Sequence, residues 1–149
     1  MTQHEIWMQY ALREAEKAYE KEEIPVGAVI IFENRLIAKG HNQVESLKDP
    51  TAHAEMLAIT SAAAYLSSKV LLGCSLYITL EPCAMCAGAI VLSKIENLYF
   101  GAFDNKSGAC GSVLDITNNS SLNHKLNVTG GVLDVQCVAL LRSFFEVKR

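Results

Sequence analysis

Two short motifs, His53-Ala54-Glu55 and Pro82-Cys83-Ala84-Met85-Cys86, most strongly limit how this chain can fold. Each lies just inside the expected start of a helix that follows a strand. Residues three apart on a helix share one face, so the two cysteine sulfurs are within reach of one metal ion. A fold that brings the two helix starts together adds the His53 imidazole as a third ligand. Three protein ligands leave one position open, which is typical of catalytic rather than structural zinc.

Apolar segments alternate with helix-like segments along the chain, as in an α/β protein. Thr2 and Glu5 have the spacing of a capping box, which predicts a first helix over residues 2–22. Asp49 followed by Pro50 predicts that a second helix begins there and ends near Tyr65. The pattern predicts a single domain over residues 1–149, with helices packed on a mixed sheet. The other expected elements are strands at 26–32 (covered on both faces), 35–41, 76–80, 97–103 and 126–129, a turn at 33–34, helices at 83–93 and from 133 onward, and a short helical turn at 113–116.

The composition excludes several classes of protein. Half of the 149 residues are hydrophobic and 19% are charged, which excludes a disordered tail. No apolar run approaches the roughly 18 residues of a membrane span, and the first residues lack the pattern of a secretory signal. Five cysteines without such a signal predict thiols or metal ligands in the reducing cytoplasm. The net charge of −3 provides no overall basic field, so a polyanion would need a local patch.

Glu55 is expected to move protons rather than to bind the metal. Positions two apart on a helix point about 200° away from each other, so His53 and Glu55 can converge only at the mouth of the helix. A carboxylate there can take a proton from zinc-activated water and pass it to a leaving group. The three other cysteines have no partner at metal-binding spacing and are interpreted as buried structural thiols: Cys74, Cys110 and Cys137.

Taken separately, the two motifs have simpler interpretations. A CxxC pair is often a redox motif or two small apolar residues on a helix, and a lone histidine or glutamate is often packed or solvated. Their joint occurrence is much more specific, because H-x-E followed by P-C-x-x-C is typical of zinc-dependent nucleobase deaminases.

Over nearly its whole length the sequence resembles the bacterial tRNA adenosine deaminases of the cytidine deaminase-like superfamily. The zinc motif marks the superfamily, whereas the stretch after the strand at 97–103 and the final helix mark the tRNA branch. The resemblance implies a three-layer cytidine deaminase-like fold, with a five-stranded mixed sheet and helices on both faces. The matching segments are Pro25–Val29, Asp49–Glu55, Thr79–Ala89, Phe100–Ala102, Asp104–Ala109 and Leu140–Phe145.

The same resemblance implies hydrolysis of adenosine to inosine at the wobble position of a tRNA anticodon loop, principally in an arginine tRNA. It implies one zinc per chain held by His53, Cys83 and Cys86, attack of zinc-bound hydroxide on C6 of adenine, and Glu55 as the proton shuttle. It further implies a homodimer with a site shared across the dimer edge, no membrane association and no organic cofactor. The residues expected to bind the substrate are Asn42, Asp104, Lys106, Asn123, Phe145 and Arg149.

Two other functions remain open at this point. A deaminase of a free nucleobase or nucleoside, such as guanine or cytosine, would share zinc and Glu55 but would need a small closed pocket and no basic patch. A zinc-stabilised protein without activity, such as an inactive partner subunit, would not require Glu55.

The final helix also allows two interpretations. Its cationic residues, Arg142 and Lys148-Arg149, form either a local RNA-binding patch or a favourable positively charged helix end. At least one of Phe144 and Phe145 is expected to lie in the core. Phe145 is either a second core residue or a residue that stacks on a base.

Overall fold

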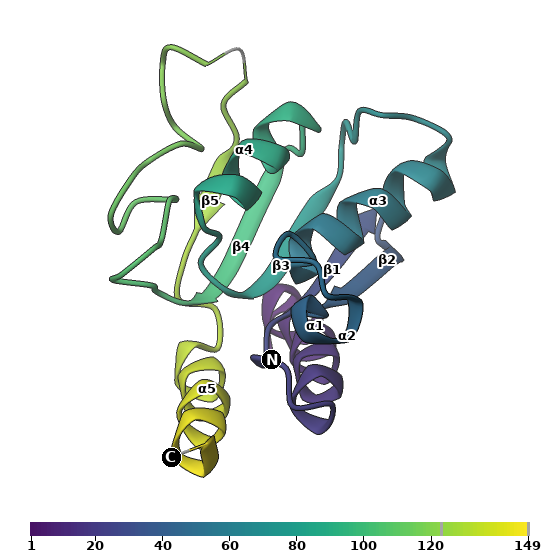
Figure 1. Cartoon of the computed structure of the whole chain (residues 1–149). Coiled ribbons are helices and arrows are strands. Elements are labelled where there is room, and N and C mark those ends of the chain that lie inside the picture. Colours follow the sequence, from purple (N-terminus) through teal and green to yellow (C-terminus); the bar gives the residue numbers. More distant parts are fainter. Residues whose placement is uncertain (123, 149) are drawn as a thin grey trace.

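A five-stranded mixed sheet lies between two layers of helices in the computed structural model, which confirms the expected architecture (Figure 1). The structure describes residues 1–122 and 124–148. Within these ranges, no helix combines the length and the apolar character that crossing a membrane requires. The helices are α1 (Gln3–Glu20), α2 (Val44–Leu47), α3 (Ala54–Leu66), α4 (Ala84–Leu92) and α5 (Asp134–Lys148), and the strands are β1 (Gly27–Phe32), β2 (Arg35–His41), β3 (Ser75–Leu80), β4 (Asn97–Ala102) and β5 (Asn127–Thr129).

The strands follow the order β2-β1-β3-β4-β5 across the sheet. β1 is antiparallel to β2 and to β3, whereas β3, β4 and β5 run parallel. Glu33 and Asn34 close the β1–β2 hairpin with φ angles of 49° and 61°, the backbone shape whose twist suits a two-residue hairpin turn. Because β3 and β4 are parallel, the segments that follow them leave the sheet at one edge, and these segments carry Cys83 and Asp104.

β1 is covered on both faces, as its near-continuous apolar sequence predicts. Successive side chains of a strand point to opposite faces. Ala28 and Ile30 belong to the apolar cluster formed with α3 and α4, and Val29 and Ile31 belong to the cluster formed with α1 and α5. The first cluster extends to the start of both α3 and α4, so it fixes the two helix starts relative to the sheet.

α1 is fixed at its start by side-chain hydrogen bonds and along its length by small residues. The predicted capping box is present: the Glu5 N–H donates to Thr2 Oγ1 at 3.1 Å, and the Thr2 N–H donates to Glu5 Oε1 at 2.9 Å. The helix packs so closely on β1 that a Cβ atom at Gly27 would overlap the backbone of Ala11 and Ala15. Glycine is therefore required at this contact.

The helix that carries the first motif begins later than the sequence predicts. The Asp49 carboxylate does not cap it, because its Oδ1 accepts hydrogen bonds from the N–H and the hydroxyl of Thr51, at 2.8 and 2.7 Å. This local turn keeps residues 49–52 outside the helix. α3 begins at Ala54 with His53 as its N-cap residue, which places the imidazole at the helix mouth.

Two further local predictions differ from the structure. No helical turn forms at residues 113–116, where Cys110 instead pairs with Asp115 in an isolated antiparallel bridge. The polar loop before Asp49 contains the one-turn helix α2, which the sequence does not predict. At α2 the deciding hydrogen bonds go to the distant Glu23, and at 113–116 the backbone N–H groups of Val113 and Ile116 bond to the carbonyls of Gly108 and Ala109 in place of a helical turn.

Candidate active site

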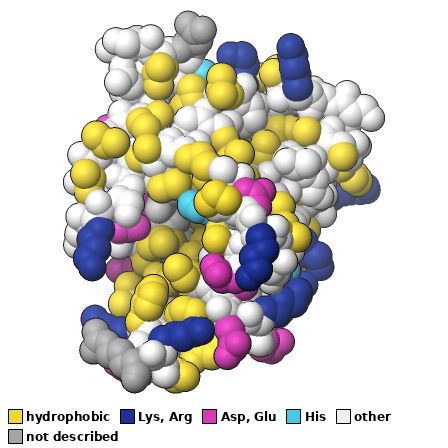
Figure 2. Space-filling view, in the orientation of Figure 1, with side chains coloured by type: hydrophobic (Ala, Val, Ile, Leu, Met, Phe, Trp, Pro, Cys, Tyr) yellow, Lys and Arg dark blue, Asp and Glu magenta, His cyan; other side chains and the backbone are white. Residues whose placement is uncertain are grey.

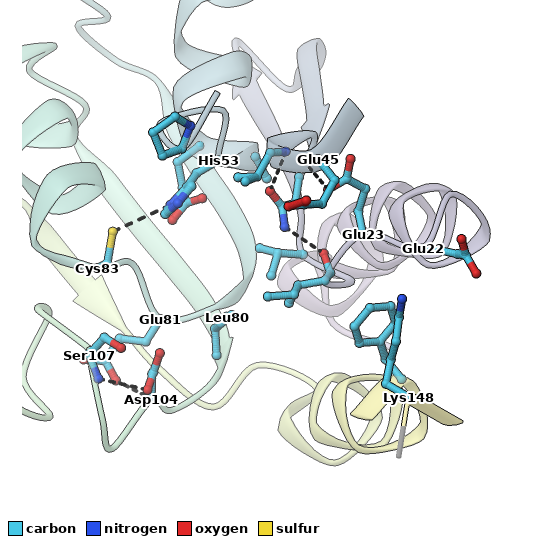
Figure 3. Close-up of a pocket in the computed structure, with 18 residues that line it drawn as sticks. Glu22, Glu23, Glu45, His53, Leu80, Glu81, Cys83, Asp104, Ser107 and Lys148 are labelled. Carbon is cyan, nitrogen blue, oxygen red and sulfur yellow. Dashed lines mark hydrogen bonds between the residues drawn. The ribbon is translucent and has the colours of Figure 1, made fainter. Parts of the chain in front are cut away.

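Three metal-ligand atoms meet where α3 and α4 begin. His53 is the N-cap residue of α3, Cys83 is the N-cap residue of α4, and Cys86 lies in the first turn of α4. His53 Nδ1 lies 3.7 Å from Cys83 Sγ (Figure 3). It lies 3.5 Å from Cys86 Sγ. All three atoms lie within 4.8 Å of one another. The fold thus brings together the three side chains that the sequence singles out as zinc ligands.

The spacing of these atoms fits a zinc ion. Zinc bonds of about 2.3 Å to sulfur and about 2.0–2.1 Å to nitrogen, at a tetrahedral angle, separate the ligand atoms by roughly 3.6 Å. The observed nitrogen–sulfur distances of 3.5 and 3.7 Å agree with that separation. Neither N-cap side chain is used to cap its own helix, so both remain available as ligands. Among the described residues, no other group of three ligand side chains has this spacing.

Glu55 lies in the first turn of α3 and is 4% exposed. Burial raises the pKa of its carboxyl group to about 7. The carboxyl group is close enough to Cys83 and Cys86 that the thiols influence its pKa, and it raises that of Cys86 in return. Glu55 and His53 therefore face one site from the helix mouth, although they are two positions apart.

The five cysteines fall into two groups. A hydrogen bond from Cys86 lowers the pKa of Cys83 to about 5, and the same bond together with burial raises that of Cys86. Cys83 is therefore the thiol that ionises first. The remaining three are buried, and burial raises the pKa of each thiol, as expected for structural residues: Cys74, Cys110 and Cys137.

His53, Cys83 and Glu55 line a pocket of about 500 Å³, a size typical of sites for small molecules, whereas the fully buried Cys86 is not part of its lining. Its walls come from the segment that follows α1, from α2, from the start of α3, from the β3–α4 junction, from the segment after β4 and from α5 (Figure 3). In the space-filling view, hydrophobic side chains are spread over the middle of this face, with acidic side chains and Lys or Arg side chains between and around them (Figure 2). The pocket suits an apolar ring better than a free phosphate.

Two of the six residues predicted to bind substrate line this pocket. The side chain of Asn42 is held by backbone groups: Nδ2 donates to the Ile24 carbonyl at 3.2 Å, and Oδ1 accepts from the Val44 N–H at 3.3 Å. Asp104 lies on another wall, where Oδ1 accepts from the N–H of Lys106 at 3.0 Å (Figure 3). Both side chains are thus preorganised at the pocket.

Two further predicted residues, Lys106 and Phe145, do not line the pocket. Lys106 is exposed outside it, and Phe145 is 47% exposed. The neighbouring Phe144 is buried and lines the pocket, so it is the core residue of the pair. The predictions for Asn123 and Arg149 lie outside the described residues.

Sequence reasoning missed two buried carboxylates that hold the pocket walls. Glu23 is 1% exposed and accepts from the N–H of Glu45 at 3.0 Å and from the N–H and hydroxyl of Ser46, at 2.7 and 2.6 Å. Glu81 is 2% exposed and accepts hydrogen bonds from the segment after β4. Burial opposes ionisation of both groups, but their hydrogen bonds lower the pKa of each. The available signal was the position of Glu81, directly before Pro82 and the cysteine motif.

Comparison with known proteins places the chain in a family. The sequence model described as the cytidine and deoxycytidylate deaminase zinc-binding region matches residues 1–102. The chain belongs to this family. The deaminase is 46% identical over 149 residues to the tRNA-specific adenosine deaminase of Bacillus subtilis (strain 168), a match that covers 100% of this chain and 92% of that protein.

Solved structures agree with this assignment. A structure from a study of A-to-I editing by tRNA:A34 deaminases at the wobble position of transfer RNA matches with a TM-score of 0.88 and 39% identity, over 91% of this chain and 98% of that one. A guanine deaminase from Nitrosomonas europaea matches with a TM-score of 0.78 and 31% identity, over 94% and 83%. The resemblance seen in the sequence is thus confirmed, including the segment beyond residue 102 that the family model does not reach.

Proposed function

We propose that this deaminase converts adenosine to inosine by hydrolysis at the wobble position of a tRNA anticodon loop, principally that of an arginine tRNA. The observation that carries the proposal is the ligand group of His53, Cys83 and Cys86, two members of which, His53 and Cys83, line one pocket together with Glu55. That group lies in a chain nearly half identical, end to end, to a curated tRNA-specific adenosine deaminase. The assignment to an arginine tRNA rests on the family resemblance alone.

In this proposal His53 Nδ1 and the sulfurs of Cys83 and Cys86 hold one zinc ion. When bound, zinc would supply Lewis acidity, which activates water for attack at a carbon atom. The cluster of small and apolar residues that packs on α3 and α4 keeps these ligands in place, with Cys86 fully buried and with His53 and Cys83 partly buried at the pocket.

Glu55 moves the protons of the reaction. Its carboxylate accepts a proton from the attacking water and delivers it to the ring nitrogen of adenine next to C6. A second transfer to the departing amine releases ammonia, so that adenosine and water give inosine and ammonia. Its place in the first turn of α3, beside the ligand atoms but outside the ligand group, supports this role.

The substrate is recognised as an unstacked base. Adenine can reach the ligand group only after leaving its stack, and this costs less for a loop base than for a paired one. Asn42 and Asp104, which line the pocket from different segments, are the proposed contacts to the nucleotide. Lys106 and Phe145 lie outside the lining and are proposed to contact flanking nucleotides.

A free-purine deaminase is the second candidate, because the Nitrosomonas europaea guanine deaminase shares the fold at 31% identity. An assay separates the two functions. The purified zinc-loaded protein is given an anticodon stem-loop with adenosine at the wobble position and, separately, free adenosine, cytidine and guanine. We expect inosine in the stem-loop and no turnover of the free compounds. Turnover of guanine with an unchanged stem-loop would overturn the proposal in favour of the second candidate.

The charges of α5 are expected to bind the RNA backbone. Lys148 lines the pocket, with Nζ 5.5 Å from the ring centroid of Phe144, and Arg142 is exposed on the same helix. Replacing Arg142 and Lys148 by alanine should weaken stem-loop binding. It should also reduce the slope of the logarithm of the binding constant against the logarithm of the salt concentration by about 0.7 for each phosphate that is no longer neutralised. The exposed Arg35 and Lys69, neither of which lines the pocket, are replaced together by alanine as the charge-matched control. An unchanged slope in the double variant would mean that RNA phosphates bind elsewhere.

We propose that the deaminase is a homodimer, as the family resemblance implies. Exposed apolar side chains on the α2, α4 and 113–114 surfaces support this, since Leu47, Leu92 and Leu114 are 53%, 80% and 52% exposed. Light scattering on the zinc-loaded protein should give twice the chain mass of 16.3 kDa. Leu92→Asp should lower that mass, and a monomeric wild type with full activity would contradict the dimer.

A further inference from the structure

The segment from Asp104 to Ser112 folds around one carboxylate, that of Glu81. Oε1 accepts a hydrogen bond from the Asp104 N–H at 3.0 Å and a second from the Ser112 hydroxyl. Oε2 accepts from the N–H groups of Cys110 and Ser112, each at 3.1 Å. Four donors therefore converge on a side chain that is 2% exposed. The Glu81 carboxylate therefore lies at the centre of this loop and not on the protein surface.

No cation accompanies this buried charge in the described part of the chain, where the ion pairs all involve Glu14. The negative charge of the Glu81 carboxylate is therefore stabilised by backbone N–H groups and a hydroxyl group alone. Hydrogen bonds to an ionised acceptor are roughly twice as strong as those between neutral groups. A buried carboxylate without these donors would be strongly disfavoured. The charge and the loop conformation therefore depend on each other.

The backbone of the loop also lies close to the segment that carries the cysteine motif. The Ala109 N–H donates to the Pro82 carbonyl at 2.8 Å, and the Glu81 N–H donates to the Ala102 carbonyl at 2.8 Å. A Cβ atom at Gly108 would overlap the carboxyl group of Glu81, so only glycine fits there. The loop thus packs on residues 81–82 through polar contacts at close range.

Both partners of this contact line the pocket. Cys83 follows Glu81 by two residues, and Asp104 and Ser107 belong to the loop (Figure 3). We propose that Glu81 is a positioning residue, which sets the distance between the wall formed by Asp104 and Ser107 and the start of α4, which carries two of the three proposed metal ligands. Its kinetic consequence rests on the proposed function, because Asp104 is a proposed nucleotide contact.

Glu81→Gln tests the proposal in the zinc-loaded protein. The amide keeps the size of the side chain, but it replaces one acceptor oxygen by an NH₂ group that faces N–H donors. We expect KM for the stem-loop to rise about 10-fold or more while kcat changes less than about 3-fold and one zinc per chain is kept. Glu81→Asp, which keeps the charge but not the reach, should give an intermediate KM. The exposed Glu96→Gln is the matched control and should change neither constant.

Hydrogen exchange provides a readout that does not depend on catalysis. In Glu81→Gln the amides of Asp104, Cys110 and Ser112 should exchange about 10-fold faster or more, because the acceptor of each is weakened or removed. Ser112→Ala, which removes only the hydroxyl donor, is the milder variant if Glu81→Gln does not fold, and it should speed exchange of the same amides to a smaller extent. Unchanged exchange, or a fall in kcat with KM unaltered, would overturn the proposal. A wild-type protein that leaves the stem-loop unreacted would instead reject the proposed function, and the exchange data would still decide the role of Glu81 in the loop.

Discussion

Glu55→Ala is expected to slow deamination of the stem-loop by roughly 10²-fold or more while leaving one zinc bound per chain. The size of the effect follows from the site. General acid–base catalysis by a positioned side chain contributes about 10²- to 10⁴-fold, and Glu55 is the carboxylate that lies beside the ligand group in the first turn of α3. Because Glu55 is outside the ligand group, its removal should leave the metal in place.

The measurement combines a single-turnover rate with a metal determination on the same preparation. Glu55→Gln serves as the isosteric companion, because it fills the same space but cannot exchange protons in the same way. Glu96→Ala, at an exposed position away from the pocket lining, is the control and should keep the wild-type rate. A Glu55→Ala protein with its zinc and its rate intact would refute the proton-transfer role, whereas loss of zinc would make Glu55 part of the metal site.

The positions of most helices and strands could be predicted because the sequence patterns that indicate them are local. The capping box at Thr2 and Glu5, the two-residue turn at Glu33-Asn34 and the apolar run of β1 each depend on residues close together in the sequence, and the structure has all three. The three proposed ligands were found for a related reason. Few side chains bind zinc, so two short motifs suffice to indicate them before the fold is known.

The parts that could not be predicted depend on contacts between distant residues. Asp49 has the identity of a helix cap, but its carboxylate is used by Thr51, and α3 begins at Ala54. Glu81 resembles an ordinary charged residue until the loop that donates to it, 23 to 31 residues later, is placed around it. Phe144 and Phe145 are equivalent in sequence, and only the approach of α5 to the pocket buries one of them.

Cys86→Ala is expected to abolish both zinc binding and activity. Cys86 is fully buried and its sulfur lies 3.5 Å from His53 Nδ1, so its replacement by alanine removes one of the three proposed ligands from the group. Two remaining ligands do not make a stable zinc site, since such sites use three or four protein ligands. Loss of the Lewis acid removes several kcal/mol of transition-state stabilisation, and the rate should fall by roughly 10³-fold or more.

Cys74→Ala is the matched control, because Cys74 is also a fully buried thiol but belongs to the apolar core. It should keep one zinc per chain and the wild-type rate, although it leaves a small core cavity. Treating the wild type with a chelator should reproduce the Cys86→Ala result, and adding zinc back should restore only the wild type. If Cys86→Ala kept full activity without metal, the reaction would not depend on the ligand group at all, and the pocket would have to activate water by Glu55 alone. If Cys74→Ala lost zinc as completely as Cys86→Ala, metal binding would depend on the packing of the whole core and not on these three side chains.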